Sequence, residues 1–237
     1  IVFLFALVFL YSCTPQDAPN TFTDSRDGKV YKTVTIGEQV WMAENLAYLP
    51  SVLGPATESH TDPYYYVYDY DGTDLDAATA TENYQTYGVL YNWPAAMVAC
   101  PEGWHLPSDD EWTELETYLA NNGYNYDGST GGDFIRAKIA ISLASANGWN
   151  FSTNPGAIGN TNTAYDAYRN KSGFSALPGG YRSYHGLFDL IGVVGYWWSC
   201  TEDGTGSAWG RGLICGGSRV YRGGSGKVYG FSVRCLR

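Results

Sequence analysis

Alternation of hydrophobic and polar residues near the start of the chain predicts paired β-strands. Residues 29–36 alternate polar and apolar side chains, a pattern typical of a half-buried strand. A turn at residues 37–39 leads into a second short strand at residues 40–42. Residues 64–70 are rich in tyrosine and fit either a strand or the wall of a groove, and residues 87–93 fit a buried strand or turn.

Helical spacing is clearest in the middle of the chain. Ser108 and Glu111 form a capping box, and the apolar residues after them recur at helical spacing, so a helix is predicted over residues 108–120. A short helix is expected over residues 94–99, because proline is preferred at a helix start. The spacing of apolar side chains predicts a second main helix over residues 133–146.

The C-terminal part of the chain interleaves two kinds of segment. Scaffold blocks rich in glycine and aromatic residues occupy residues 173–182, 195–199 and 230–235. The gap segments between them, residues 183–194 and 210–229, show neither helical nor strand periodicity, so they are expected to be loops. A rigid frame that displays patternless loops indicates a binding protein.

Composition favours an extracellular domain of short strands and ordered loops. Of the 237 residues, 16% are aromatic, only 16% are charged, and 29 are glycine. The formal net charge of −10 argues against nucleic acid as a partner, because that binding depends on cations that neutralise phosphates. No segment is rich enough in linker residues to divide the chain, so residues 24–237 are expected to form a single domain.

The first residues resemble a bacterial lipoprotein signal peptide. Residues 1–11 form an apolar run that is too short to span a bilayer and fits the hydrophobic part of a signal peptide. The segment ending at Cys13 resembles a lipobox, so residues 1–13 are interpreted as an N-terminally truncated signal peptide and residues 14–23 as a tether. An ordinary signal peptide with an incidental cysteine is the alternative. Lipidation of Cys13 would place the protein outside the cytoplasm, held at the outer membrane or cell surface of a bacterium resembling the Bacteroidota by its lipid anchor alone.

The chain has five cysteines, and an even number remains once Cys13 is set aside as the lipid site. An even number suits disulfides in an oxidising compartment. No Cys-x-x-Cys pair occurs, so neither zinc nor thioredoxin-type chemistry is supported.

Several motifs, in order along the chain, resemble the Fibrobacter succinogenes major paralogous domain. They include Trp41-Met42-Ala43-Glu44-Asn45-Leu46, Tyr87-Gly88-Val89-Leu90-Tyr91-Asn92-Trp93, Ala99-Cys100-Pro101-Glu102-Gly103-Trp104-His105-Leu106-Pro107-Ser108 and Gly230-Phe231-Ser232-Val233-Arg234-Cys235. That family is abundant among secreted and surface proteins and is placed with C-type-lectin-like folds. The resemblance therefore implies an α+β fold with small antiparallel sheets, two main helices and a long loop region.

The resemblance also implies one disulfide. In a C-type-lectin-like frame, a cysteine near the first helix bonds to one in the last strand, and Cys100 and Cys235 occupy these places. Cys200 and Cys215 depart from the family pattern. They are either a second disulfide or two free thiols.

The sequence predicts no catalytic residues, no cofactor and no obligatory metal. The calcium motifs of C-type lectins do not occur, and the acidic run at residues 69–82 lacks EF-hand spacing, so it is expected to be a solvated loop. Formylglycine-generating enzymes have a related fold, but nothing here matches their cysteine site. The three histidines, His60, His105 and His185, lie near no nucleophile motif, and His105 is expected to make a structural hydrogen bond. The protein is therefore expected not to be an enzyme.

The expected partner is an unidentified protein or glycan at the cell surface. Tryptophans within scaffold motifs are expected to be core residues: Trp93, Trp104, Trp112, Trp197 and Trp198. The candidate ligand-binding residues lie in or beside the gap segments: Tyr184, His185, Trp209, Arg211, Arg219, Tyr221, Arg222 and Tyr229. A carbohydrate-binding or adhesion module is one alternative, and a structural surface protein without a discrete ligand is another.

The composition of the gap segments leads to a hypothesis about their origin. No asparagine follows Asn170, whereas the resemblance implies that relatives carry asparagine often in these gaps. Retroelements that randomise adenines convert asparagine codons into codons for residues such as Tyr, Ser, Gly and Arg, which are common here. Diversification by such an element is one explanation, and ordinary drift of surface loops is the other. A near-identical template repeat beside a reverse transcriptase gene in the native locus would distinguish them.

Overall fold

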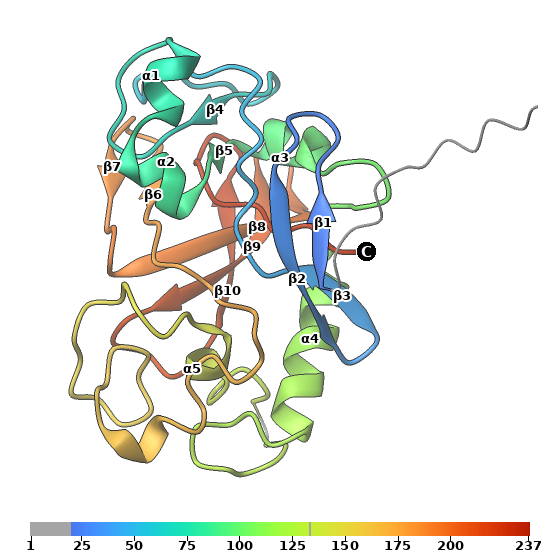
Figure 1. Ribbon diagram of the computed structural model, residues 1–237, viewed down its shortest axis with the longest axis vertical. Coiled ribbons are helices and arrows are strands. Elements are labelled where there is room, and N and C mark those ends of the chain that lie inside the picture. Colours follow the sequence, from blue (N-terminus) through green and yellow to red (C-terminus); the bar gives the residue numbers. More distant parts are fainter. Residues whose placement is uncertain (1–19, 133) are drawn as a thin grey trace, which may run out of the picture.

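The computed structural model describes residues 20–132 and 134–237, and these residues form an α+β fold of short strands and helices joined by long segments (Figure 1). The strands are β1 (Thr21–Thr23), β2 (Val30–Ile36), β3 (Gln39–Met42), β4 (Tyr65–Tyr66), β5 (Leu90–Tyr91), β6 (Tyr181–Arg182), β7 (Phe188–Asp189), β8 (Val194–Gly204), β9 (Ser207–Ile214) and β10 (Tyr221–Gly226). The helices are α1 (Leu75–Thr79), α2 (Glu82–Tyr87), α3 (Trp93–Ala99), α4 (Asp109–Asn121) and α5 (Ala140–Leu143), with a 3-10 turn at Thr163–Tyr165.

The sheets are small and antiparallel, as expected. β1, β2 and β3 form one three-stranded sheet, and β8, β9 and β10 form a second in the order β10-β9-β8. The hairpin expected at residues 29–42 is confirmed as β2 and β3. Residues 21–23 were expected to belong to the tether, but they form β1 because they pair with residues 30–32. The expected signal peptide, Cys13 and the first part of the tether lie outside the described residues.

Two helices match the sequence prediction. α3 covers the short helix predicted over residues 94–99, and α4 begins at the predicted capping box. The hydroxyl of Ser108 accepts from the backbone N–H of Glu111, and the Glu111 carboxylate accepts from the backbone N–H of Ser108. The apolar stripe of α4, formed by Trp112, Leu115 and Leu119, is buried in the core.

The second main helix expected over residues 133–146 is wrong apart from α5. The carbonyl of Arg136 accepts from the N–H of Val220, and the carbonyl of Lys138 accepts from the N–H of Tyr126. These backbone groups pair with distant segments, so they are not available for a continuous helix. Residue 133, where the expected helix begins, lies outside the described residues.

The acidic run at residues 69–82 is more ordered than a solvated loop. It contains α1, and α2 begins at its last residue. The Asp74 carboxylate accepts from the N–H of Ala77 and caps α1, and the Thr81 hydroxyl accepts from the N–H of Tyr84 and caps α2. The polar residues Asp74 and Thr81, whose type is also common in loops, thus act as N-caps of two short helices.

The gap segments are not all loops, which corrects a central sequence expectation. Residues 207–214 are β9, which pairs with β8, and residues 221–226 are β10, which pairs with β9 at the edge of the second sheet. Gly210 and Gly212 of β9 and Gly223 of β10 fall on one face of this sheet. Strand periodicity is invisible there because glycine stands where an apolar side chain would mark that face.

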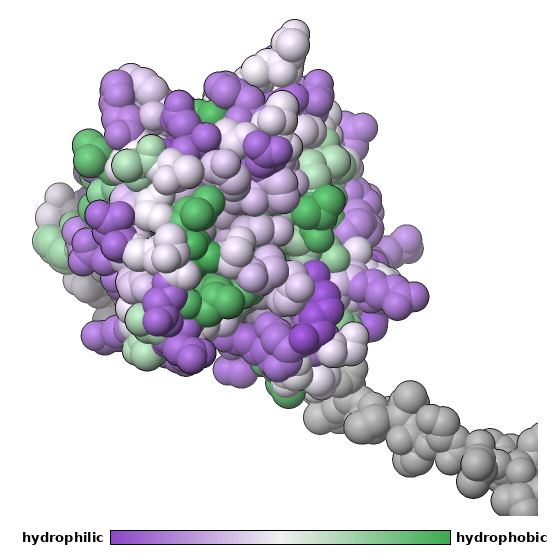
Figure 2. Space-filling view, turned by 90° about the horizontal axis from the view of Figure 1, so that it is seen from above, coloured by the Kyte–Doolittle hydropathy of each residue, from purple (hydrophilic) through white to green (hydrophobic). Residues whose placement is uncertain are grey.

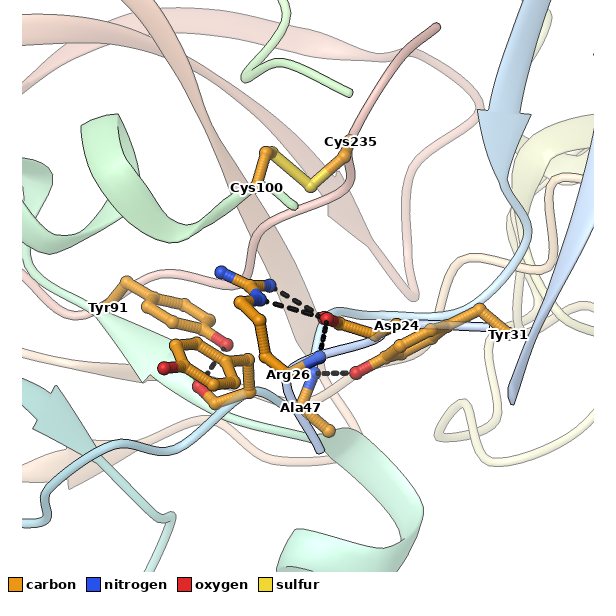
Figure 3. Close-up of a disulfide and its surroundings, with 8 residues drawn as sticks. Asp24, Arg26, Tyr31, Ala47, Tyr91, Cys100 and Cys235 are labelled. Carbon is orange, nitrogen blue, oxygen red and sulfur yellow. Dashed lines mark hydrogen bonds and ion pairs between the residues drawn. A yellow bond between two sulfur atoms is a disulfide. The ribbon is translucent and has the colours of Figure 1, made fainter. Parts of the chain in front are cut away.

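The C-terminal segment returns to the N-terminal sheet and is fastened there. Cys235 forms a disulfide with Cys100, at the end of α3, as the family resemblance implied (Figure 3). Leu236 makes isolated antiparallel bridges with Trp41 of β3 and with His105. Two distant parts of the chain therefore meet at this point.

Cys200 and Cys215 are free thiols, so the second disulfide does not form. Val194 pairs with Ile214 at one end of the β8–β9 hairpin, which places Cys215 beside that end. Cys200 lies six residues beyond Val194 on β8, roughly 20 Å away at the usual rise of a strand. A disulfide needs Cα atoms within about 7 Å of each other, so this pair is out of reach.

The surface is mixed in polarity. On the face seen in Figure 2, apolar residues form small separate groups among polar ones. In the described part of the chain, no helix combines the length and the apolar character needed to cross a membrane.

Candidate functional site

The two faces of the β8–β9–β10 sheet differ in what covers them. On one face, the β9 residues Arg211 and Leu213 point toward α4 and the core. On the opposite face lie Gly210 and Gly212, which have no side chains to fill the space above them. The alternation of β9 thus leaves this second face to be covered by aromatic side chains of neighbouring segments, with Tyr196 directly against Gly212.

A pocket of about 350 Å³ lies over this glycine-rich face. We call it the tyrosine pocket. Its walls are the aromatic side chains of Tyr181, Tyr196, Tyr221, Tyr229 and Phe231. Its floor and rim are completed by Gly210, Arg211, Gly212, Arg222, Gly223 and Ser225. A volume of this order suits one ring-sized ligand.

The aromatic walls support one another. The Tyr196 and Phe231 rings are stacked, with centroids 5.0 Å apart, and Tyr181 meets Tyr196 edge-on at 5.6 Å. Burial raises the pKa of Tyr181, Tyr196 and Tyr229. Their hydroxyls therefore stay protonated at neutral pH and can both donate and accept hydrogen bonds.

The glycines of the floor have different surroundings. A Cβ atom at Gly212 would overlap the ring of Tyr196, so the tyrosine lies directly against the backbone. A Cβ atom at Gly223 would meet nothing within 4 Å, because it would point into open space. Glycine at these places is what allows both the close packing of Tyr196 and the empty volume beside it.

An ion-pair network on the opposite face fastens α4 to the sheet. Arg211 pairs with Glu116 at 2.6 Å (Nε to Oε1) and with Asp109 at 2.7 Å (Nη1 to Oδ1). Arg222 pairs with the same Asp109 at 2.8 Å (Nε to Oδ1), and Arg136 pairs with Glu116 at 3.1 Å (Nη1 to Oε2). Because the side chains of Arg211 and Arg222 cross to this face, these residues border the tyrosine pocket with their backbone.

Burial affects the two carboxylates of this network differently. Desolvation alone would raise the pKa of Asp109, but hydrogen bonds from Arg222 and Arg211 outweigh it and lower that pKa. Glu116 is more deeply buried, so desolvation raises its pKa in spite of Arg211 and Arg136. Asp109 is thus the carboxylate whose charge the network stabilises more strongly.

Comparison with known families matches residues 34–237 to the Fibrobacter succinogenes major domain. The chain belongs to this family. The match covers α4, the disulfide and every residue of the tyrosine pocket. No curated protein and no solved structure matches the chain.

In this Fibrobacter succinogenes major domain, five of the eight expected ligand-binding residues gather around the tyrosine pocket. Tyr221 and Tyr229 form part of its wall. Tyr184 lies against Tyr229, with ring centroids 5.6 Å apart, and against His185 at 3.7 Å. The Arg219 guanidinium lies 4.1 Å from the centroid of the Tyr221 ring.

The other three expected residues lie on the far face of the sheet. Arg211 is only 1% exposed, and its side chain pairs with two carboxylates of α4, so it borders the pocket with its backbone and does not offer its guanidinium to a ligand there. The Arg222 side chain forms an ion pair with Asp109, and its guanidinium also lies 3.5 Å from the centroid of the Trp209 ring. Charge and glycine content did not reveal that Arg211 has two carboxylate partners on α4.

Sequence reasoning missed the part of the wall formed by Tyr181, Tyr196 and Phe231, because these residues stand in scaffold blocks. A usable signal was present at Gly210-Arg211-Gly212, since glycine in a strand often marks a close approach by another group. The core assignment of tryptophans is correct for Trp104, Trp112, Trp197 and Trp198, which are buried, whereas Trp93 is half-buried.

The side chains that line the tyrosine pocket are aromatic or small, apart from the two arginines. None of the described residues that line it is an acid, a histidine or a cysteine. Across residues 20–132 and 134–237, no group of three or more His, Cys, Asp or Glu side chains could hold a metal ion. The Nε2 of His105 lies 2.8 Å from Oε1 of Glu111, which is the structural hydrogen bond expected for it.

Proposed function

We propose that this domain is a non-enzymatic binding module and that its ligand enters the tyrosine pocket. The observation that carries the proposal is a cavity of ring-sized volume whose walls are five aromatic side chains and whose floor is glycine. Aromatic rings with polar hydroxyls offer contact area and hydrogen bonds at a low cost in conformational entropy. A structural module without a ligand would have no need to keep this space empty.

We also propose that the domain works at the bacterial cell surface within a C-type-lectin-like frame. The long-range disulfide from the end of α3 to the C-terminal segment supports both parts of this proposal. It belongs in an oxidising compartment, and it joins the same parts of the chain that such frames join. Surface attachment through a lipid on Cys13 rests on the sequence pattern alone, and mass spectrometry of the mature N-terminus tests it.

Diversification of the C-terminal segments stays a hypothesis, but the structure separates the positions where variation would alter the pocket from those where it would break the fold. Tyr184, His185, Arg219, Tyr221 and Tyr229 surround the tyrosine pocket, so changes at these positions would alter the ligand surface. Changes at the other candidate arginines would instead break the ion pairs that hold α4. Variation in native relatives should therefore concentrate at the first set, and the template repeat remains the test.

The binding role can be tested by filling the pocket. Gly223→Leu places a side chain in the open space above the floor without contacting existing atoms at its Cβ. Gly206→Leu is a matched control. A Cβ at Gly206 also meets open space, but Gly206 lies in the β8–β9 turn and does not line the pocket. Wild type and both variants are screened against a glycan array and a displayed peptide library, and the affinity of each hit is measured.

Wild type should bind at least one class of ligand, and Gly223→Leu should weaken that binding at least about tenfold. Gly206→Leu should leave it unchanged. Equal binding by wild type and Gly223→Leu would show that the ligand uses another surface. A wild-type protein that binds nothing in either library would contradict the binding role.

A further inference from the structure

A second, smaller cavity adjoins the tyrosine pocket at the start of β10. We call it the arginine pocket. It has a volume of about 210 Å³ and is lined by Phe134, Arg136, Arg219, Val220, Tyr221 and Arg222. Tyr221 and Arg222 line both cavities. The Arg222 side chain crosses to Asp109, so Tyr221 is the side chain that joins the two cavities, and a ligand bound against its ring lies close to Arg219.

The three arginines of this cavity differ in how fully their charge is neutralised. Arg136 pairs with Glu116 and Arg222 pairs with Asp109. Arg219 is exposed and makes no ion pair with any residue in the described part of the chain. Its guanidinium rests instead 4.1 Å from the centroid of the Tyr221 ring, against the wall of the tyrosine pocket.

Among the described side chains of this region, arginines outnumber the carboxylates that act on them, although the whole chain is acidic. Four arginines lie in this region, counting Arg211 behind the sheet, and three carboxylates act on them: Asp109, Glu116 and Asp203. The chain as a whole carries a formal net charge of −10. A cavity with a surplus arginine on such an acidic protein concentrates positive potential where most of the surface repels anions.

We propose that the arginine pocket is an anion subsite and that the ligand of this domain is an acidic saccharide. The proposal rests on the proposed function and specifies its ligand. A sugar ring in the tyrosine pocket would pack its C–H face on the aromatic walls and exchange hydrogen bonds with the protonated tyrosine hydroxyls. Its carboxylate or sulfate would reach Arg219, whose planar guanidinium matches such groups with two parallel hydrogen bonds.

The shape of the site favours a saccharide over an acidic peptide. The tyrosine pocket is a compact cavity of about 350 Å³ with rings on several sides, so it fits a single ring better than an extended chain. Its aromatic walls have polar hydroxyls, which suits a ligand that has both C–H faces and many hydroxyl groups. An acidic peptide is retained as an outcome of the test.

The test uses acidic glycans printed beside neutral counterparts of the same backbone. The array holds uronate oligosaccharides with their carboxyl-reduced forms, sulfated oligosaccharides with their desulfated forms, and sialylated glycans with their asialo forms. Proteins compared are the wild type, Arg219→Gln and Arg237→Gln. Arg237 is the matched control, since it is also exposed and rests on an aromatic ring, 4.9 Å from the centroid of Trp104.

Wild type should bind one or more acidic glycans at least about tenfold more tightly than their neutral counterparts, and added salt should reduce this preference. Arg219→Gln should lose most of the preference while keeping the weak binding of the neutral form. Arg237→Gln should behave as wild type. Gly223→Leu should abolish binding of both forms, because it removes the space for the ring itself.

Three results would overturn the inference. They are equal binding of acidic and neutral forms, an Arg219→Gln variant with unchanged preference, and binding of acidic peptides in place of glycans. In each case the proposed function survives if Gly223→Leu still blocks the ligand that is found. It fails separately if filling the tyrosine pocket has no effect.

Discussion

At the scale of single residues, glycine controls the shape of the tyrosine pocket. Gly212 has no side chain, so the Tyr196 ring can lie directly against the backbone of β9. Gly223 faces open space on the neighbouring strand. Two glycines on one sheet face therefore have opposite tolerance for a side chain, although both look like loop residues in the sequence.

This difference predicts the stability of two variants. Gly212→Val should lower the free energy of unfolding by about 1–3 kcal/mol, because the new side chain must displace Tyr196 from a packed position. Gly223→Val should be neutral or slightly stabilising, since valine favours a strand and meets no neighbour at its Cβ. Denaturant unfolding measures both, and equal losses would mean that Gly212 does not support the Tyr196 wall.

At the scale of elements, the sheet and α4 are coupled by buried charge. α4 begins with a capping box and presents an apolar stripe to the core, while Asp109 and Glu116 reach the arginines of β9 and β10. The same arginines border the tyrosine pocket with their backbone. The position of α4 therefore helps to hold the strands that form the floor.

Asp109→Asn should lower the free energy of unfolding by about 2 kcal/mol at neutral pH, because hydrogen bonds to charged groups are lost at a buried position. The pKa of Asp109 is lowered in the folded state. Its stabilisation is therefore complete above the unfolded-state pKa of about 3.9 and is lost as the pH falls toward the folded-state pKa. The difference between variant and wild type should shrink below about pH 4.

Denaturant unfolding between neutral and acidic pH measures this difference. Asp110→Asn is the control, because Asp110 is the next residue on α4, is exposed and makes no ion pair in the described part of the chain. Its effect should be small. A pH-independent loss at Asp109, or an equal loss at Asp110, would show that the ion pairs do not fasten the helix.

At the scale of the whole molecule, the C-terminal segment is tied to the middle of the chain and to the N-terminal sheet. The disulfide joins Cys100 and Cys235 across a sequence separation of 135 residues, and the C-terminal segment bridges to β3. A crosslink over such a long loop restricts the unfolded chain strongly. The free thiols of Cys200 and Cys215 make no comparable link.

Replacing Cys100 and Cys235 together by serine should lower the free energy of unfolding by about 4–5 kcal/mol, the value expected for a loop of this length. Replacing Cys200 and Cys215 together should cost clearly less, because no covalent link is lost. Urea unfolding of the two double variants compares them. A larger loss for the second pair would contradict the arrangement of the C-terminal segment described above.

Much of the domain was predictable wherever local sequence determines structure. The β2–β3 hairpin follows from alternation, and α4 follows from its capping box and apolar stripe. Both depend on residues that are close together in the chain, so their patterns are visible in a single sequence. Ordered motifs predict the family and its disulfide, and the gap segments point to Tyr221 and Tyr229, which form part of the pocket wall.

Only the tertiary structure decided the rest. The helix expected over residues 133–146 was replaced by backbone pairing with residues far along the chain. The patternless segments became β9 and β10 because they pair across the β8–β10 sheet in a register that glycine conceals. Arg211 became a core residue because α4 brings two carboxylates to it. In each case the deciding interaction joins residues distant in sequence, and the energy of such a contact depends on a neighbour that the local pattern does not contain.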